Sequence, residues 1–263
     1  MLGIIDTHTH YDDEAFDADR DELIESLYQS GIESIVNAGS TASSLKKVIE
    51  LTAKWDNMYG ALGIHPDEAN DLTAELYEEI REELNNPKIV AVGEIGLDYH
   101  WMVCPKELQA QKLVMQLELA RESDKPVIIH SRDAAADTFS LLDENANGLT
   151  GIIHCYAYSV EMAKEYVKKG FLLGIGGVVT FPNAKKLKEV VKEIPLSSLV
   201  LETDCPYLAP VPYRGKRNNS AYLTYVADEI AKIKGFERAE VIEKTTENAK
   251  RLFAIQNGEL SWK

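Results

Sequence analysis

The sequence predicts an α/β fold of the TIM (β/α)8 barrel type, in which eight parallel strands alternate with helices. Three observations support this prediction. Eight short apolar runs occur along the 263 residues, amphipathic segments separate them, and the runs end at regular intervals. The ends fall near residues 10, 38, 65, 94, 130, 154, 176 and 204, so each interval can hold one strand, one helix and two short loops.

The eight runs are continuously apolar, which is typical of parallel strands that are buried on both faces. Between them, apolar residues recur with helical spacing, as they do from Leu187 to Ile194. Gly31 and Gly170 each follow a helical segment and precede a strand, as helix-ending glycines do. We expect strands within 3–6, 32–39, 58–65, 88–96, 126–130, 151–155, 171–176 and 198–204, and final helices near 218–234 and 237–254.

The alternative fold is an open doubly wound sheet, which needs a glycine-rich phosphate turn after an early strand. Gly174, Gly176 and Gly177 occur late in the chain and lack that spacing, so we favour the barrel. No glycine- or serine-rich linker or low-complexity segment interrupts the pattern. We therefore expect residues 1–263 to form a single barrel domain.

The composition excludes several classes of protein. The 28 basic and 43 acidic residues give a net charge of −15, which argues against a broad basic face for nucleic acid or anionic membranes. A pocket that handles one phosphate at a time remains compatible with this charge. The chain has three cysteines and no CxxC pair, and it begins without a basic leader, so we expect a cytoplasmic protein. It has no long apolar stretch, so we expect no membrane segment. No obligate protein partner is evident.

Six residues of metal-ligand type fall at or near the C-terminal ends of the expected strands, where barrel enzymes build their active sites. His8 and His10 are two positions apart, so both imidazoles point to the same face of a strand. Imidazoles and carboxylates that converge on one cavity suit divalent transition metals. Each residue alone could be an ordinary hydrogen-bonded side chain, but together they exceed one tetrahedral site. We expect two ions bridged by Glu94, with ligands from His8, His10, Glu94, His130, His154 and Asp204.

Seven motifs indicate a resemblance to a known family. The chain resembles the TatD-type metal-dependent hydrolases of the amidohydrolase superfamily, and its motifs follow one another in the same order as in that family. The motifs are DTHTHYD (6–12), GIHP (63–66), GEIGLDY (93–99), HSRDA (130–134), GIIHCY (151–156), VTFPNA (179–184) and LETDCPYLAPVPYRGKRN (201–218).

The resemblance implies that His8, His10 and Asp204 bind one ion, that His130 and His154 bind a second, and that Glu94 is shared. The metal identity stays open among Zn, Mn, Mg, Fe and Ni. Thr9 stands where the family often has cysteine, and His100 where it usually has an aromatic residue. Ala157 and Tyr158 also depart from the family pattern, and they leave the substrate preference open.

The expected catalytic residues are Glu94 and Asp204. Asp204 is the candidate base that takes a proton from water, although it could serve as a metal ligand only. Phosphate needs cationic or N–H donors. His65 is surplus to the metal set, and the resemblance suggests that it contacts phosphate. The other candidates are Arg132 and three cations in a loop that carries no acid between residues 205 and 227: Arg214, Lys216 and Arg217.

Trp101 follows the GEIGLDY motif, and it could pack in the core or stack on a base. The resemblance implies a divalent-metal phosphodiesterase that acts on DNA at chain ends, as an exonuclease does, through metal-activated water. The alternative is a metal-dependent hydrolase of a small amide, ester or lactone, or of an acyl group on tRNA. A metal-binding scaffold without turnover is a third interpretation.

Overall fold

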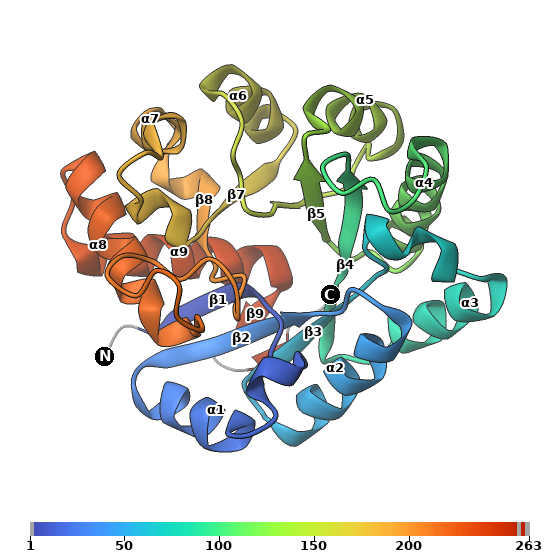
Figure 1. The fold of residues 1–263 in the computed structure, drawn as a ribbon, viewed down its shortest axis with the longest axis horizontal. Coiled ribbons are helices and arrows are strands. Elements are labelled where there is room, and N and C mark those ends of the chain that lie inside the picture. The colour runs from blue at the N-terminus through green and yellow to red at the C-terminus, as the bar shows by residue number, and fades with distance from the viewer. Residues whose placement is uncertain (1–2, 257–258, 261–263) are drawn as a thin grey trace.

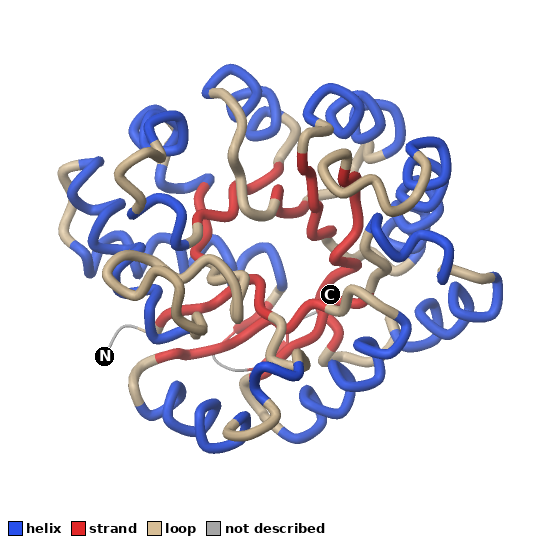
Figure 2. The backbone as a smooth tube through the Cα atoms, viewed as in Figure 1, coloured by secondary structure: helices blue, strands red, loops and turns tan. Residues whose placement is uncertain are grey.

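The structure is a computed structural model that describes residues 3–256 and 259–260. Eight parallel strands form one sheet in the order β1 to β8, and this sheet curls into a ring (Figures 1 and 2). The predicted TIM barrel is therefore confirmed. The strands are β1 (Ile4–Thr9), β2 (Ile32–Ala38), β3 (Met58–Leu62), β4 (Ile89–Asp98), β5 (Val127–Arg132), β6 (Gly151–Ile153), β7 (Phe171–Ile175) and β8 (Leu199–Leu201).

Helices surround the ring of strands (Figure 1). Among the described residues, one α-helix follows each of the first seven strands, and two follow β8. They are α1 (Arg20–Gln29), α2 (Ala42–Lys54), α3 (Ala74–Glu83), α4 (Lys106–Glu122), α5 (Ala135–Asn145), α6 (Val160–Lys168), α7 (Lys185–Glu193), α8 (Leu223–Lys234) and α9 (Arg238–Phe253). A short antiparallel pair of strands, β9 (Ile255–Gln256) and β10 (Glu259–Leu260), follows α9. Among the described residues, no helix combines the length and the hydropathy that a membrane span needs.

The hydrophobic core has two layers, because successive side chains of a strand point to opposite faces. The outer layer lies between the strands and the helices. The inner layer contains residues from all eight strands, together with Ala249 and Phe253 of α9 and with Ile255 just after that helix. Its strand residues are Ile5, Val36, Ala38, Tyr59, Ala61, Val90, Ala91, Ile128, Ile152, Leu172 and Val200. The barrel is thus a packed core, and polar side chains find room only beyond this layer.

The ring closes between β1 and the segment after β8. The Asp204 amide donates to the His8 carbonyl at 3.0 Å, and the His10 amide donates to the Cys205 carbonyl at 2.9 Å. Below them, the Asp6 carboxylate accepts hydrogen bonds from the Thr203 and Ser220 hydroxyls, both at 2.7 Å. These bonds fix the backbone of Asp204 relative to His8 and His10.

Some strand boundaries differ from the predicted ones. Glu94, expected at the end of the fourth strand, lies inside β4, which continues to Asp98. Asp204, expected at the end of the eighth strand, lies three residues beyond β8, with a φ of 56°. His65 likewise follows the end of β3 and caps the short 3-10 helix η2 (Pro66–Asp71). The apolar runs end in polar turns that leave the sheet, and hydrophobicity alone does not separate a strand from the turn that follows it.

Candidate metal centre

A cavity of about 540 Å³ opens where the carboxyl ends of the barrel strands meet. The six residues predicted as metal ligands lie together here. Five of them line the cavity: His10, Glu94, His130, His154 and Asp204. The sixth, His8, is fully buried, and its ring stacks on that of His154 with 3.6 Å between the centroids.

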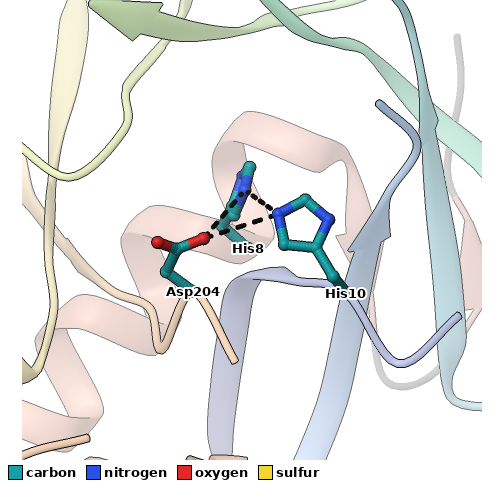
Figure 3. Close-up of side chains that lie close together, drawn as sticks. All are labelled: His8, His10 and Asp204. Atoms are coloured by element: carbon teal, nitrogen blue, oxygen red, sulfur yellow. Dashed lines mark hydrogen bonds and ion pairs between the residues drawn. The ribbon is translucent and has the colours of Figure 1, made fainter. Parts of the chain in front are cut away.

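His8, His10 and Asp204 form one compact set of potential ligands (Figure 3). The Nε2 atoms of the two histidines are 3.0 Å apart. Oδ1 of Asp204 lies 3.8 Å from Nε2 of His8 and 3.4 Å from Nε2 of His10. His8 lies in β1 and His10 directly follows it, and their two imidazoles meet Asp204 from the other end of the chain at one point.

Glu94 lies between two groups of histidines. Its Oε2 atom is 3.3 Å from Nε2 of His8 and 3.6 Å from Nε2 of His10. Its Oε1 atom is 2.8 Å from Nδ1 of His130 and 3.9 Å from Nε2 of His154. Each carboxylate oxygen therefore faces a different group, which is the arrangement that a bridging carboxylate requires.

Two of the imidazoles have an oxygen atom close to the nitrogen on the far side of the ring. Nδ1 of His10 lies 3.0 Å from the carbonyl oxygen of Ala38 and can only donate to it. Its Nε2 atom is therefore the nitrogen that faces Asp204 and Glu94. Nδ1 of His154 lies 3.1 Å from Oε1 of Glu202, and its Nε2 faces the same two carboxylates. Such an acceptor behind a ring is the usual support of a metal-binding histidine.

His130 has a carboxylate on each side of its ring. Nδ1 contacts Glu94, and Nε2 lies 3.1 Å from Oδ2 of Asp98. The rings of His130 and His154 are parallel within 27°, but their centroids are 6.4 Å apart. Potential ligand atoms of His130 accordingly group with Asp98 and His65, whereas those of His154 group with His8 and Glu94. The second predicted ligand set is thus less compact than the first.

The charges in this cluster are unbalanced in a way that favours cations. The cluster contains four carboxylates. Among the described residues, every ion-pair partner within 4.0 Å of these carboxylates is a histidine, and none is a lysine or an arginine. Burial opposes protonation of the imidazoles, yet nearby carboxylates raise the pKa of His130 to about 9 and that of His154 to about 10. A site that attracts protons this strongly also attracts metal ions, and its imidazole and carboxylate donors suit divalent ones. The four carboxylates belong to Glu94, Asp98, Glu202 and Asp204.

His65 faces the cluster with a single nitrogen. The Asp67 amide donates to its Nδ1 at 3.2 Å, so the ring proton is on Nε2, which lies 3.9 Å from Oε1 of Glu94. Burial lowers the pKa of His65 to about 4, so the ring is neutral near pH 7. It therefore offers the cavity a neutral N–H donor.

Arg132 and Trp101 stand together at the mouth of the cavity. The guanidinium carbon of Arg132 lies 5.4 Å from the centre of the Trp101 ring, a cation–π contact. Trp101 is 62% exposed, which excludes the interpretation that it packs in the core. His100, in contrast, is not part of the cavity lining, and its Nδ1 lies 3.0 Å from Oδ2 of Asp133.

The three cations of the acid-free loop do not line this cavity. Arg214, Lys216 and Arg217 line a second, neighbouring cavity instead. Arg217 forms a two-pronged ion pair with Asp19, through contacts of 2.7 and 2.6 Å. Its charge is thus already compensated by a surface carboxylate.

Sequence reasoning missed two residues of the centre, Asp98 and Glu202. Both are almost completely buried behind a histidine that was predicted as a ligand. A usable signal existed for Glu202, because an acid inside an otherwise apolar run has to face a partner. Gly174 of the neighbouring strand β7 leaves the space that the Glu202 side chain occupies, since a Cβ atom at this position would lie only 2.0 Å from Oε2 of Glu202.

The whole chain is similar to several known proteins. The model of the family described as TatD related DNase matches residues 5–254. "Uncharacterized metal-dependent hydrolase YabD" of Bacillus subtilis (strain 168) is 46% identical over 253 residues, which cover 96% of this chain and 99% of that protein. "Uncharacterized metal-dependent hydrolase YcfH" of Escherichia coli (strain K12) is 34% identical over 263 residues, with 98% of each chain covered. The crystal structure of YJJV, a TatD homolog from Escherichia coli K12, has a TM-score of 0.88 at 29% identity and covers 97% of this chain and 100% of that one.

Proposed function

Since this chain belongs to the family of TatD-related DNases, we propose that it is a metal-dependent hydrolase that cleaves phosphodiester bonds of DNA from strand ends. The observation that carries the proposal is the position of Glu94, whose two oxygens face two groups of histidines. The relatives described above are named as metal-dependent hydrolases, which supports the first half of the proposal. The DNA substrate is the finer step, and the family description supports it.

We propose that two divalent cations occupy the centre, with Zn, Mn, Mg, Fe and Ni as candidates. His8, His10 and Asp204 would hold one of them, and His130 and His154 the other. Glu94 would be shared by both. Within the part of the chain that the structure describes, Nδ1 of buried His8 has no hydrogen-bond partner, whereas its Nε2 faces Glu94 and His10 and would be the ligand atom.

The protein side chains have distinct roles in the proposed reaction. Divalent ions supply Lewis acidity, which lowers the pKa of water and polarises phosphoryl oxygens. Asp204 would take the proton of the attacking water. Its side chain is 19% exposed, so solvent reaches it, and although burial opposes ionisation, the hydrogen bond from His10 and the nearby imidazoles lower its pKa. A carboxylate that is ionised at neutral pH can accept this proton.

The reacting phosphate needs donors on the open side of the cavity. Nε2–H of His65 is suited to a phosphate oxygen, because it is a neutral donor next to Glu94. Arg132 would supply a full positive charge at the mouth, and Trp101 holds its guanidinium in place. Such groups stabilise the charge that develops in the transition state of phosphoryl transfer.

The test is release of nucleotides from end-labelled single-stranded DNA in the presence of Mg²⁺ or Mn²⁺. Wild-type protein should produce a ladder that shortens from one end, and Glu94→Ala and Asp204→Ala should abolish it. Equal nucleotide release by these variants would refute the proposal. Turnover of a small amide, ester or lactone, or of an aminoacyl-tRNA, without cleavage of DNA would favour the alternative substrate class. Bound metal with no turnover of any of these would favour a scaffold.

The domain organisation and the cellular location can be proposed as well. We propose that residues 1–263 act as one domain, which the family match over residues 5–254 supports. We also propose a cytoplasmic location, which the three free cysteines support.

A further inference from the structure

A second cavity, of about 680 Å³, lies beside the metal centre. The two cavities share Asp13, Tyr207 and Leu208 in their linings, so they are neighbours on one face of the barrel. The second cavity is otherwise built by the loop after β8, with Phe181 and Ala15 at its sides. A chain that fills the first cavity can therefore continue into the second.

The two cavities carry opposite charge. Seven acids and one arginine line the first cavity, in addition to its histidines. Three cations and one acid line the second. The first cavity is thus suited to metal ions, and the second is suited to an anion. In a chain whose net charge is −15, this local excess of cations is unusual.

Two of the three cations are available for a ligand. Among the described residues, neither Arg214 nor Lys216 has an ion-pair partner, whereas Arg217 is paired with Asp19. The Arg214 guanidinium carbon lies 4.4 Å from the centre of the Phe181 ring, which positions the charge without neutralising it. Free, positioned cations of this kind bind phosphate groups.

Tyr207 forms the wall between the two cavities. Its hydroxyl donates to Oδ2 of Asp13 at 3.0 Å, and its ring centroid lies 6.5 Å from that of His10. The side chain is nevertheless 54% exposed. A ring that is anchored at its hydroxyl and open on a face provides a surface for base stacking, and such stacking tolerates any base.

We infer that the second cavity is a subsite for the part of a single strand that adjoins the scissile bond. Arg214 and Lys216 would bind the next phosphates of the backbone, and Tyr207 would stack on a base between the cavities. This inference rests on the proposed function, and it refines the substrate class to single-stranded oligonucleotides with more than one phosphate. A substrate with a single phosphate would occupy the first cavity only.

The experiment compares two substrates in Mn²⁺: a single-stranded 12-mer with a fluorescent end, and bis(p-nitrophenyl) phosphate, which has one phosphodiester. The test variant is Arg214→Glu/Lys216→Glu. Its matched control is Lys164→Glu/Lys232→Glu, which changes the net charge equally at two exposed lysines outside both cavities. Arg214→Gln/Lys216→Gln repeats the test without introducing acids, in case the first variant folds poorly.

The inference predicts that both test variants lose selectivity for the 12-mer over the small diester by tenfold or more. The loss should come from KM, with kcat for the 12-mer within about twofold of wild type, and the control should keep the wild-type ratio. Equal loss on both substrates, a loss in kcat alone, or an unchanged ratio would overturn the inference.

Binding of the 12-mer in EDTA separates this inference from the proposed function, because it needs no hydrolysis. For single strands, each phosphate contact adds about 0.7 to the slope of log affinity against log salt concentration. Removal of two contacts should therefore reduce the slope by about 1.4. If wild-type protein cleaves neither substrate, the proposed function fails, and a reduced slope would still uphold the subsite. An unchanged slope would refute the subsite whether or not the protein is a nuclease.

Discussion

Oε1 of Glu202 lies 3.1 Å from Nδ1 of His154, on the side of the ring that faces away from Glu94 and Asp204. The same oxygen accepts a hydrogen bond of 2.6 Å from the Cys155 amide. Glu202 is fully buried, so this contact replaces its interaction with water. The carboxylate therefore determines which nitrogen of His154 points into the centre.

We expect Glu202→Gln to weaken metal binding about 10- to 100-fold, because support of this kind raises the basicity of the histidine and orients it. Gly174→Ala should have a similar effect, since its Cβ would displace the Glu202 carboxylate. Metal titration of the metal-free protein measures the affinity. The exposed Glu189→Gln on α7 is the control. Unchanged affinity in both variants would show that Glu202 does not position His154.

Glu94 and Asp204 should differ in their effects on metal content. Glu94 contacts both groups of histidines, whereas Asp204 belongs with His8 and His10 to the one compact set of potential ligands. We therefore expect Glu94→Gln to reduce binding of both proposed ions, and Asp204→Asn to reduce mainly one. Metal analysis of dialysed protein gives the number of ions per chain. Identical losses in the two variants would contradict a shared Glu94.

Arg217 should contribute to stability and not to substrate binding. Asp19 holds it on the surface, and the hydrogen bond from Arg217 is the main cause of the lowered pKa of Asp19. We expect Arg217→Ala to reduce the free energy of unfolding by less than about 1 kcal/mol near pH 7. KM for the 12-mer should stay unchanged, in contrast with the Arg214 and Lys216 variants.

The pH dependence of this contribution has a definite sign. A carboxylate with a lowered pKa in the folded state stabilises the fold above its unfolded-state pKa, which is near 3.8 for Asp19. The effect of Arg217→Ala should therefore be full at pH 6 and vanish as the pH falls below 3.8 and Asp19 becomes protonated. Denaturant unfolding at several pH values measures it. A larger effect at pH 3 than at pH 6 would refute the assignment.

Lys125 should destabilise the fold at neutral pH. It is buried before β5 and donates to the Ile89 carbonyl, and burial lowers its pKa from 10.5 to about 8. The unfolded chain binds this proton more tightly, so stability rises between pH 8 and pH 10.5. We expect Lys125→Met to be more stable than wild type at pH 7, by up to roughly 3 kcal/mol, less the lost hydrogen bond.

The difference between Lys125→Met and wild type should shrink as the pH rises from 8 to 10.5. Denaturant unfolding of both proteins at pH 7 and pH 10 measures it, and other groups that titrate in this range cancel in the comparison. A constant difference across this range would contradict the lowered pKa.

The sequence by itself determined the class of fold and the family, and it predicted a ligand set for the centre. Continuous apolar runs predicted strands buried on both faces, and the two layers of the core confirm this because each strand contributes residues to both. The six predicted ligands were recognisable because imidazoles and carboxylates recur at corresponding points of successive strands. Such periodic signals are local, and a linear sequence retains them.

Only the tertiary structure decided how these residues relate in space. It placed Glu202 behind His154 and Asp98 behind His130, and no local pattern in the sequence shows which histidine each acid supports. It also distinguished three cations that are close in sequence and line the second cavity together: Arg217 pairs with Asp19, whereas Arg214 and Lys216 have no ion-pair partner among the described residues. Ion pairs between residues about 200 positions apart depend on the path of the chain, and their geometry exists only once the barrel has closed.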